Sequence, residues 1–221
     1  DTVIPMDLIN SAIDRDVTLA ASEPILWGLD VARFGGDNSA LCIRQGNTVL
    51  EITTFNSMDL MQLCGAIKNR YDDSTVMERP QEILVDVIGL GSGVVDRLAE
   101  QNLPVRGVNV AEAPSTKKNY LNLRAELWFA IKDWLAQRDC RLPNNDELAS
   151  ELAAPQYKYT SSGKIKIESK DEMRKRGIKS PDKADALALT MASSAASFGG
   201  SQAFMGYNFK KPLKSRIFRV G

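Results

Sequence analysis

Histidine is absent from this chain of 221 residues. Its absence excludes hydrolases that depend on a Ser-His-Asp or Cys-His arrangement, zinc sites with histidine ligands, and acid–base catalysis by an imidazole. Any hydrolytic chemistry must therefore use carboxylates, lysine or a hard cation bound by oxygen atoms. Magnesium and manganese are cations that prefer oxygen ligands.

Cysteine is scarce, and its three positions, Cys42, Cys64 and Cys140, lie far apart. Without a Cys-x-x-Cys pair, the set is typical of a reducing compartment and argues against a zinc site. The chain also lacks a signal peptide and an apolar run of about 18 residues, which predicts a soluble protein with no membrane partner. Hydrophobic residues make up 43% of the sequence, enough for one large domain.

Net charge is zero over the whole chain but unevenly distributed. Residues 1–100 carry a net charge of −9, and residues 101–221 carry +9. A neutral protein with a basic half can bind a polyanion through one face. Ordinary solvated lysines explain the same balance equally well.

The spacing of apolar residues predicts a mixed α/β domain. A nearly continuous apolar run over 25–31 is typical of a central strand covered on both faces. The turn Gln45-Gly46-Asn47 predicts a hairpin of the strands at 40–43 and 48–55. Strands are predicted at 25–31, 40–43, 48–55, 83–87 and 104–110, helices at 57–70, 94–101, 118–137, 148–154 and 180–196, and an exposed hairpin at 157–167. This is the element order of the RNase H-like fold, a mixed sheet of five or more strands flanked by helices, here with an added β-hairpin.

The chain is expected to have three parts. Residues 1–24 are predicted to be an interdomain linker, residues 25–197 the α/β domain, and residues 198–221 a basic and flexible tail. Because the sequence begins with Asp1, we expect it to be a fragment of a longer polypeptide.

Four aspartates occur where the surrounding sequence predicts burial. Asp30 ends the first predicted strand and Asp86 the fourth, and both are expected at one edge of the sheet because these strands should be parallel neighbours. Asp182 and Asp185 share one face in the first turn of the last helix, for which Ser180 is the predicted N-cap. A buried carboxylate needs a partner or a metal ion, and the sequence shows no obvious basic partner. The four acids therefore predict a site for divalent cations.

Simpler explanations exist for each acid alone. A single aspartate at a strand end is more often a turn or cap residue, and Asp182 could merely complement the helix dipole. Three separated acids at matching positions of one fold favour the metal site. Asp37, in the glycine-containing loop after the first strand, either supports a metal ligand from behind or only shapes the turn. The glycine-rich segment 89–93 lacks the Lys-Ser/Thr of a phosphate loop and is predicted to open a helix.

Several sequence blocks resemble the nuclease domain of the large terminase subunit of tailed bacteriophages, a member of the RNase H-like superfamily. The blocks are Trp27-Gly-Leu-Asp30-Val-Ala-Arg-Phe-Gly-Gly-Asp37, Val85-Asp86, Glu168-Ser-Lys170, and Arg176-Gly-Ile-Lys-Ser-Pro-Asp182-Lys-Ala-Asp185. The resemblance spans about residues 20–195, and its last part is the most specific. It implies that Asp30, Asp86 and Asp185 are the catalytic metal ligands, and that Asp182 fills a neighbouring, less secure position.

The resemblance also implies a function. It is the cutting of concatemeric double-stranded viral DNA into genome-length pieces during packaging into procapsids, by an endonuclease with two Mg²⁺ or Mn²⁺ ions. The implied partners are DNA, an N-terminal packaging ATPase domain, a small terminase subunit and the portal or procapsid. The implied location is the host cytoplasm.

Basic residues are concentrated between Tyr157 and Lys183, where nine lysines and arginines occur. Phosphate contacts dominate the affinity of proteins for DNA, so DNA-backbone contacts are predicted for Lys164, Lys166, Lys170 and Arg174. A solvated hairpin face explains any one of these residues equally well.

Two other functions compete with the nuclease. One is a non-catalytic DNA-gripping module that acts beside the packaging ATPase and whose acids are structural. The other is an actin-like or sugar-kinase phosphotransferase, which shares the Gly-x-Asp pattern of the first strand but needs a second glycine-rich phosphate loop.

Overall fold

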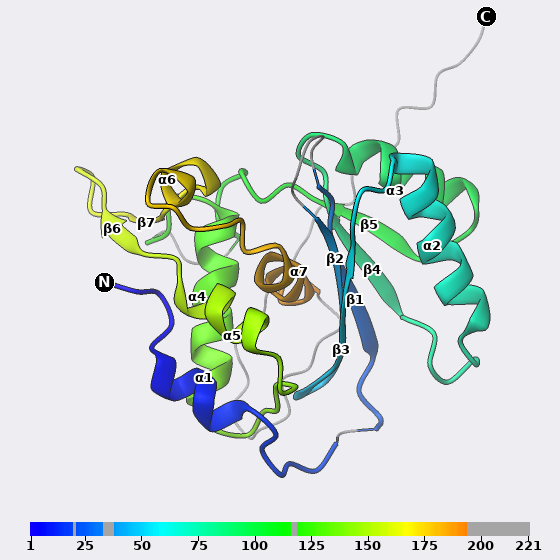
Figure 1. The fold of residues 1–221 in the computed structure, drawn as a ribbon, viewed down its shortest axis with the longest axis horizontal. Helices are drawn as coiled ribbons and strands as arrows, with labels where there is room; N and C mark the ends of the chain where they lie inside the picture. The colour runs from blue at the N-terminus through cyan, green and yellow to red at the C-terminus, as the bar shows by residue number, and fades with distance from the viewer. Residues whose placement is uncertain (20, 33–37, 116–118, 194–221) are drawn as a thin grey trace, which may run out of the picture.

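A five-stranded mixed sheet forms the centre of the protein in this computed structural model, which describes residues 1–19, 21–32, 38–115 and 119–193. The strands follow the order β3-β2-β1-β4-β5 across the sheet (Figure 1). Their bounds are β1 (Ile25–Asp30), β2 (Ser39–Gln45), β3 (Thr48–Phe55), β4 (Glu82–Asp86) and β5 (Val105–Val108). A separate hairpin consists of β6 (Tyr157–Tyr159) and β7 (Ile165–Ile167).

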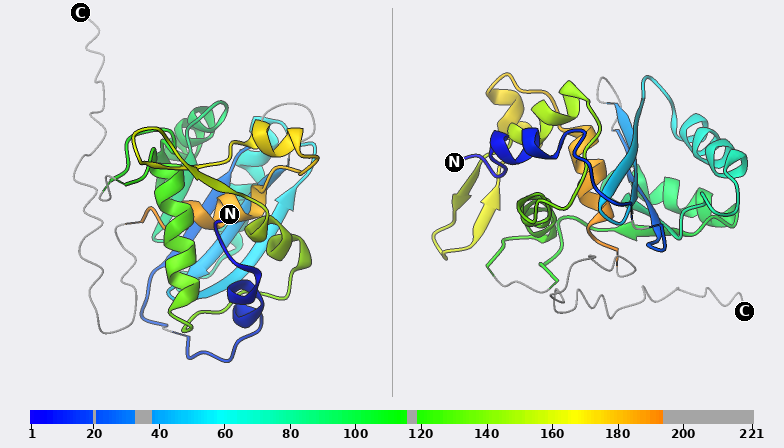
Figure 2. Two further views of the ribbon diagram at one scale, coloured as in Figure 1. Left: turned by 90° about the vertical axis from the view of Figure 1, so that its left-hand side faces the viewer. Right: turned by 90° about the horizontal axis from the view of Figure 1, so that it is seen from below.

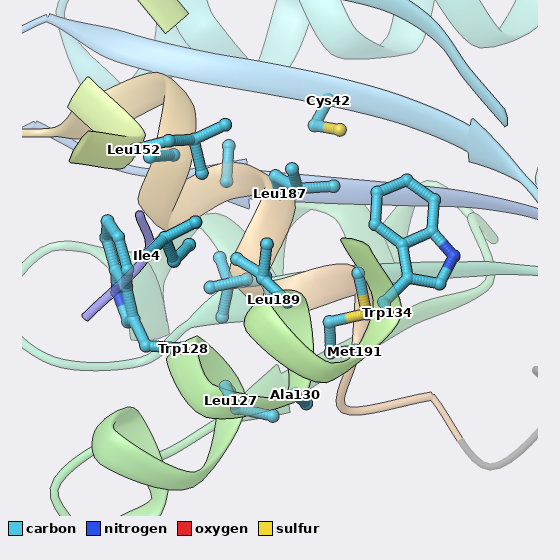
Figure 3. Packing of buried hydrophobic residues seen from close by; sticks show 14 of the residues in the cluster. Ile4, Cys42, Leu127, Trp128, Ala130, Trp134, Leu152, Leu187, Leu189 and Met191 are labelled. Carbon is cyan, nitrogen blue, oxygen red and sulfur yellow. The ribbon is translucent and has the colours of Figure 1, made fainter. Parts of the chain in front are cut away.

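The helices cover both faces of the sheet. They are α1 (Met6–Ala12), α2 (Leu60–Asp73), α3 (Gly91–Glu100), α4 (Leu123–Ala136), α5 (Asp146–Ala153), α6 (Lys170–Lys175) and α7 (Asp182–Thr190). In Figures 1 and 2, α2 and α3 cover one face, and α7 lies on the other between the sheet and α4. Each face has its own apolar cluster, and the larger one joins α1, α4, α5 and α7 to the sheet (Figure 3).

Strand directions place the two strand-end acids together. β1 pairs antiparallel with β2 but parallel with β4, and all six residues of β1 are buried. The parallel pairing brings the carboxyl ends of β1 and β4 to the same edge of the sheet, where Asp30 and Asp86 are the last residues of their strands. The predicted mixed sheet and the added hairpin, β6–β7, are confirmed.

Helix α7 approaches the sheet so closely that β1 needs a glycine. A Cβ atom added to Gly28 would lie 1.9 Å from the carbonyl oxygen of Ala186. The backbone of α7 therefore packs directly against β1, two residues before Asp30, which fixes the position of the α7 acids relative to that strand.

Side chains from other elements hold both ends of α7. At its start, the Ala184 N–H donates to Glu151 Oε2 of α5 over 2.9 Å. At its end, the buried Arg44 of β2 donates from Nη2 to the Thr190 carbonyl over 2.9 Å and from Nε to the Thr190 hydroxyl over 2.8 Å. The contacts to the Ala184 N–H and the Thr190 carbonyl satisfy backbone groups that a helix leaves unpaired at its ends.

Two local predictions need correction. Ser180 is not the N-cap, because α7 begins at Asp182 with Pro181 in the N-cap position and no capping side chain of its own. Glu151 meets that need from a helix distant in sequence, which a local pattern cannot show. Helix α6 was not predicted; its six residues are stabilised by a capping box between Ser169 and Glu172.

The first residues of the chain join the main core. Val3, Ile4 and Ile9 are fully buried, and Thr2 forms a β-bridge with Gln156. The domain boundary at residue 24 remains a prediction, and the predicted tail at 198–221 lies outside the described residues. Within the described part of the chain, no helix has both the length and the apolarity that a membrane span requires.

Candidate active site

Four acids gather in one cavity at the carboxyl edge of the sheet. Asp30, Asp86, Asp182 and Asp185 all line a cavity of about 320 Å³. Three of them are buried, with exposed fractions of 5% for Asp30, 7% for Asp182 and 8% for Asp185. The structure thus brings together the strand ends and the first turn of α7, as the sequence analysis expected. Asp37 lies outside the described residues.

Lys170 reaches into this acid cluster from α6. Its Nζ atom lies 2.9 Å from Asp30 Oδ2, 3.2 Å from Asp185 Oδ2 and 3.3 Å from Asp182 Oδ1. The view that the acids have no basic partner was therefore wrong. The partner was missed because Lys170 is 140 residues away from Asp30 and belongs to a helix that the sequence pattern did not reveal.

Asp185 has two further donors, both from α4. The indole Nε1 of Trp128 donates to Asp185 Oδ1 over 2.9 Å, and Arg124 Nη2 donates to the same oxygen over 3.2 Å. Arg124 also donates from Nη1 to the carbonyl of Glu168, over 2.8 Å. The sequence predicted a helix over 118–137 but assigned a role to neither residue. Their spacing of four residues, which puts a cation and an indole N–H on one helix face, was the available signal.

Burial and neighbouring charges shift the pKa values of the four acids in different directions. Burial raises the pKa of Asp30 to about 7, although the nearby Lys170 ammonium acts to lower it. Burial also raises the pKa of Asp86 and of Asp182. For Asp185, burial is outweighed by Arg124, Lys170 and the Trp128 indole, so its pKa lies below the usual range. Lys170 loses solvation, but the three carboxylates raise its pKa further, so it carries a charge at neutral pH.

The donor set fits a hard divalent cation, but the present arrangement is closed around an ammonium. Among the described residues, no three carboxyl or thiol groups lie close enough together to hold a metal ion as they stand. Carboxylate oxygens are the ligands that Mg²⁺ and Mn²⁺ prefer, and the Lys170 ammonium already places a cation between three of these acids. A metal ion at this position requires the ammonium to move away.

The residues predicted to contact DNA have different surroundings. Lys164 is exposed next to the hairpin turn, whereas Lys166 lies 3.5 Å from Glu172. Arg174 pairs with Asp171 at 2.9 Å and lines the acid cavity. Lys170 is held among the acids. The structure therefore leaves Lys164 as the member of this set that faces solvent with no side-chain ion pair among the described residues.

A second cavity, of about 490 Å³, adjoins the first. Arg174 and Asp182 line both cavities, and the second extends past Glu151 and Lys179. The two cavities therefore share part of their walls near the start of α7.

Comparisons with known proteins give structural likeness without sequence matches. No family model and no curated protein matches the chain. The nuclease domain of the large terminase subunit gp2 of bacterial virus Sf6 superimposes with a TM-score of 0.71 at 20% identity, covering 86% of this chain and 98% of that one. The same domain solved with manganese, as a variant, gives 0.70 at 20% identity over 86% and 99%. The large terminase nuclease of thermophilic phage G20c with bound magnesium gives 0.60 at 15% identity, covering 85% and 96%.

These structures establish the fold. The chain has the RNase H-like architecture of terminase nuclease domains over most of its length, which confirms the fold predicted from the sequence. At sequence identities of 20% and below, the structural likeness establishes the fold and does not establish the function.

Proposed function

We propose that this chain is a metal-dependent endonuclease that cuts concatemeric double-stranded DNA during the packaging of a viral genome. The observation that carries the proposal is the gathering of Asp30, Asp86, Asp182 and Asp185 in one cavity at the carboxyl edge of the sheet. The likeness to terminase nucleases, two of them with bound manganese or magnesium, supports it.

Asp30, Asp86 and Asp185 are the proposed catalytic ligands of two Mg²⁺ or Mn²⁺ ions, with Asp182 as a further ligand. Asp37 is proposed to support one of these ligands from behind, without contacting the metal itself. Such cations supply an activated water and offset the negative charge that develops on the departing oxygen. Asp30 and Asp185 each have an oxygen within 3.2 Å of the Lys170 ammonium, so they face the same point in space.

The chain's own cations have distinct tasks in this proposal. Lys170 neutralises the acids while no metal is bound, because carboxylates at such short range repel one another strongly. Arg124 and Arg174 line the cavity and add positive charge where a DNA phosphate would enter. No imidazole base is needed, in keeping with the absence of histidine.

DNA outside the cavity would contact basic side chains of the β6–β7 hairpin and α6. Lys164 is the first candidate, because its ammonium is exposed. The proposed partners are a packaging ATPase domain, a small terminase subunit and a portal or procapsid, in the host cytoplasm.

A non-catalytic DNA-gripping module remains the second candidate, because one observation favours it. The ion pairs of Lys170 already stabilise three of the four acids without a metal ion. In that case the carboxylates would be structural, and the protein would bind DNA without cutting it.

Plasmid nicking separates the two functions. Supercoiled plasmid is incubated with the chain in Mg²⁺, Mn²⁺ or EDTA, beside an Asp30→Asn variant whose fold is checked by circular dichroism. The nuclease predicts relaxed and linear products that require the cation and disappear in the variant. Intact plasmid in every lane, from protein that retards DNA in a gel, would favour the gripping module.

A further inference from the structure

Asp185 presents its two oxygens to different surroundings. Oδ1 accepts hydrogen bonds from Trp128 Nε1 at 2.9 Å and Arg124 Nη2 at 3.2 Å, both from α4. Oδ2 lies 3.2 Å from the Lys170 ammonium, inside the cavity. The carboxylate is therefore turned so that one oxygen faces the protein and the other faces the site.

Two other acids of the cluster accept hydrogen bonds from backbone N–H groups. Asp86 Oδ1 accepts the Ile88 N–H at 3.1 Å, and Asp182 Oδ2 accepts the Asn38 N–H at 3.3 Å. In both cases a backbone donor holds one oxygen. Asp185 differs because side chains of another helix supply its donors.

We propose that Trp128 is a positioning residue, which holds Asp185 so that it binds a divalent cation through Oδ2 alone. The inference rests on the proposed metal-dependent function. It adds to the site a residue that does not contact the metal and acts on it through the ligand Asp185. Outer partners that orient a metal ligand typically contribute 10–100-fold to metal affinity or activity.

The surroundings of Trp128 make its indole suited to this task. The side chain is fully buried in the main apolar cluster, where Figure 3 shows it with Leu127 and Ala130 of α4 and Leu187 and Leu189 of α7. A ring packed in this way has no freedom to turn, so the direction of its N–H is fixed. Because the indole is neutral, it orients Asp185 without adding a positive charge that would oppose a metal ion. Arg124 does add a positive charge, so its replacement would change both the orientation of Asp185 and the charge of the site. Replacement of Trp128 changes only the orientation, so Trp128 is the residue to test.

A purely structural role makes a different prediction. A buried indole N–H needs an acceptor in any case, and Asp185 could serve only as that acceptor. The loss of the N–H would then lower the stability of the fold and leave the cation affinity unchanged.

The test compares two tryptophan-to-phenylalanine variants of the whole chain. Trp128→Phe removes the donor to Asp185, whereas Trp27→Phe makes the same change at another fully buried site, where Nε1 has no acceptor among the described residues. Mn²⁺ affinity is measured by isothermal titration calorimetry, and folding by thermal unfolding in EDTA. We expect at least tenfold weaker Mn²⁺ binding for Trp128→Phe and less than a twofold change for Trp27→Phe.

Equal affinity for both variants, or no Mn²⁺ binding by the wild-type chain, would overturn the inference. If the wild-type protein binds Mn²⁺ but does not nick DNA, the nuclease proposal is refuted. The positioning role of Trp128 is then still decided by the comparison of Mn²⁺ affinities. The two failures are therefore distinguishable.

A second measurement needs no folded Trp128 variant. In the ¹⁵N–¹H spectrum of the wild-type chain, each of the three tryptophans gives one indole signal. Addition of Mg²⁺ should shift the Trp128 signal, since its acceptor becomes a metal ligand, and leave the Trp27 signal in place. An unmoved Trp128 signal at saturating Mg²⁺ would also overturn the inference.

Discussion

At the scale of single residues, Lys170 decides the state of the acid cluster. Its ammonium contacts three carboxylates, and its side chain is 32% exposed, so the ammonium can be displaced toward the solvent. A divalent cation competes for the same oxygens. We therefore interpret the ammonium as occupying the position that a divalent cation would take.

The Lys170→Ala variant tests this interpretation. In EDTA we expect a loss of about 1–3 kcal/mol in the free energy of unfolding, less than for a fully enclosed pair, because unpaired carboxylates remain buried. Mn²⁺ should restore the stability, and the variant should bind Mn²⁺ more tightly than wild type does. Thermal unfolding with and without Mn²⁺ measures both effects.

The control for Lys170 is Lys175→Ala, which removes an exposed lysine at the end of the same helix. It should change neither stability nor Mn²⁺ affinity. Weaker Mn²⁺ binding by Lys170→Ala than by this control would show that the ammonium supports the cation site instead of competing for it.

Residue identities at the site were only partly predictable. Asp30, Asp86, Asp182 and Asp185 could be placed because each stands at the end of an apolar strand or the start of an apolar helix. The contact of Lys170 with them depends on tertiary structure, since the lysine is brought in by a short helix with few apolar residues. A lysine in a basic segment gave no sign that it faces inward.

At the scale of elements, the contact between α7 and β1 sets the geometry of the acids. Gly28→Ala would push a methyl group into the carbonyl of Ala186, since the added Cβ atom lies 1.9 Å away. We expect the free energy of unfolding to fall by about 3 kcal/mol, and nicking to fall with it as α7 moves from Asp30. Chemical denaturation and the plasmid assay measure the two losses.

Gly65→Ala is the matched control for this prediction. Gly65 lies inside α2, and an added Cβ would meet nothing within 4 Å. Alanine should stabilise the protein there by about 0.5–1 kcal/mol, because it favours the helix. A destabilisation of Gly28→Ala no larger than the change at Gly65 would contradict the close packing of α7 on β1.

The contact between α5 and α7 should give the fold a pH dependence. Burial raises the pKa of Glu151 from 4.5 to about 8, although backbone N–H groups of Ala184 and Lys183 act to lower it. The folded state therefore binds a proton that the unfolded state releases, and this contribution to stability is lost as the pH rises from about 5 to above 8. Glu151→Gln keeps an acceptor but cannot ionise. The stability of Glu151→Gln relative to wild type should therefore rise between about pH 5 and pH 8. The difference in Tm between the two proteins measures this change.

A constant difference in Tm between pH 5 and pH 9 would contradict this assignment. Glu51→Gln is the comparison, because Glu51 lies on β3, and its carboxylate pairs with Arg70 at the surface. Its Tm difference should not grow in the direction expected for Glu151.

The elements themselves were largely predictable, because β1 to β5 and α2 to α5 carry clear apolar periods or turn signals. The departures have physical causes. Helix α6 is too short for a period and depends on the capping box of Ser169, and the start of α7 is set by Glu151 from outside. Helix α1 gave only a weak pattern, since its buried residues pack on a core that the rest of the chain supplies.

At the scale of the whole molecule, the excess positive charge of residues 101–221 matters where it is not already paired. Lys164 is exposed, whereas Lys166 lies close to Glu172. We expect Lys164→Ala to weaken DNA binding and to reduce the slope of log K against log salt by about one. Lys166→Ala should have a smaller effect. Fluorescence anisotropy with duplex DNA at several salt concentrations makes the comparison, and equal effects would contradict the pairing argument.

The most direct test of the central claim is a crystal structure of this chain soaked in Mn²⁺, with anomalous diffraction to locate the ions. The account predicts manganese between Asp30, Asp86 and Asp185, with Asp185 bound through Oδ2 and the Lys170 ammonium displaced. Crystals saturated with Mn²⁺ that show no anomalous peak in this cavity, and Lys170 still in contact with Asp30, would contradict it.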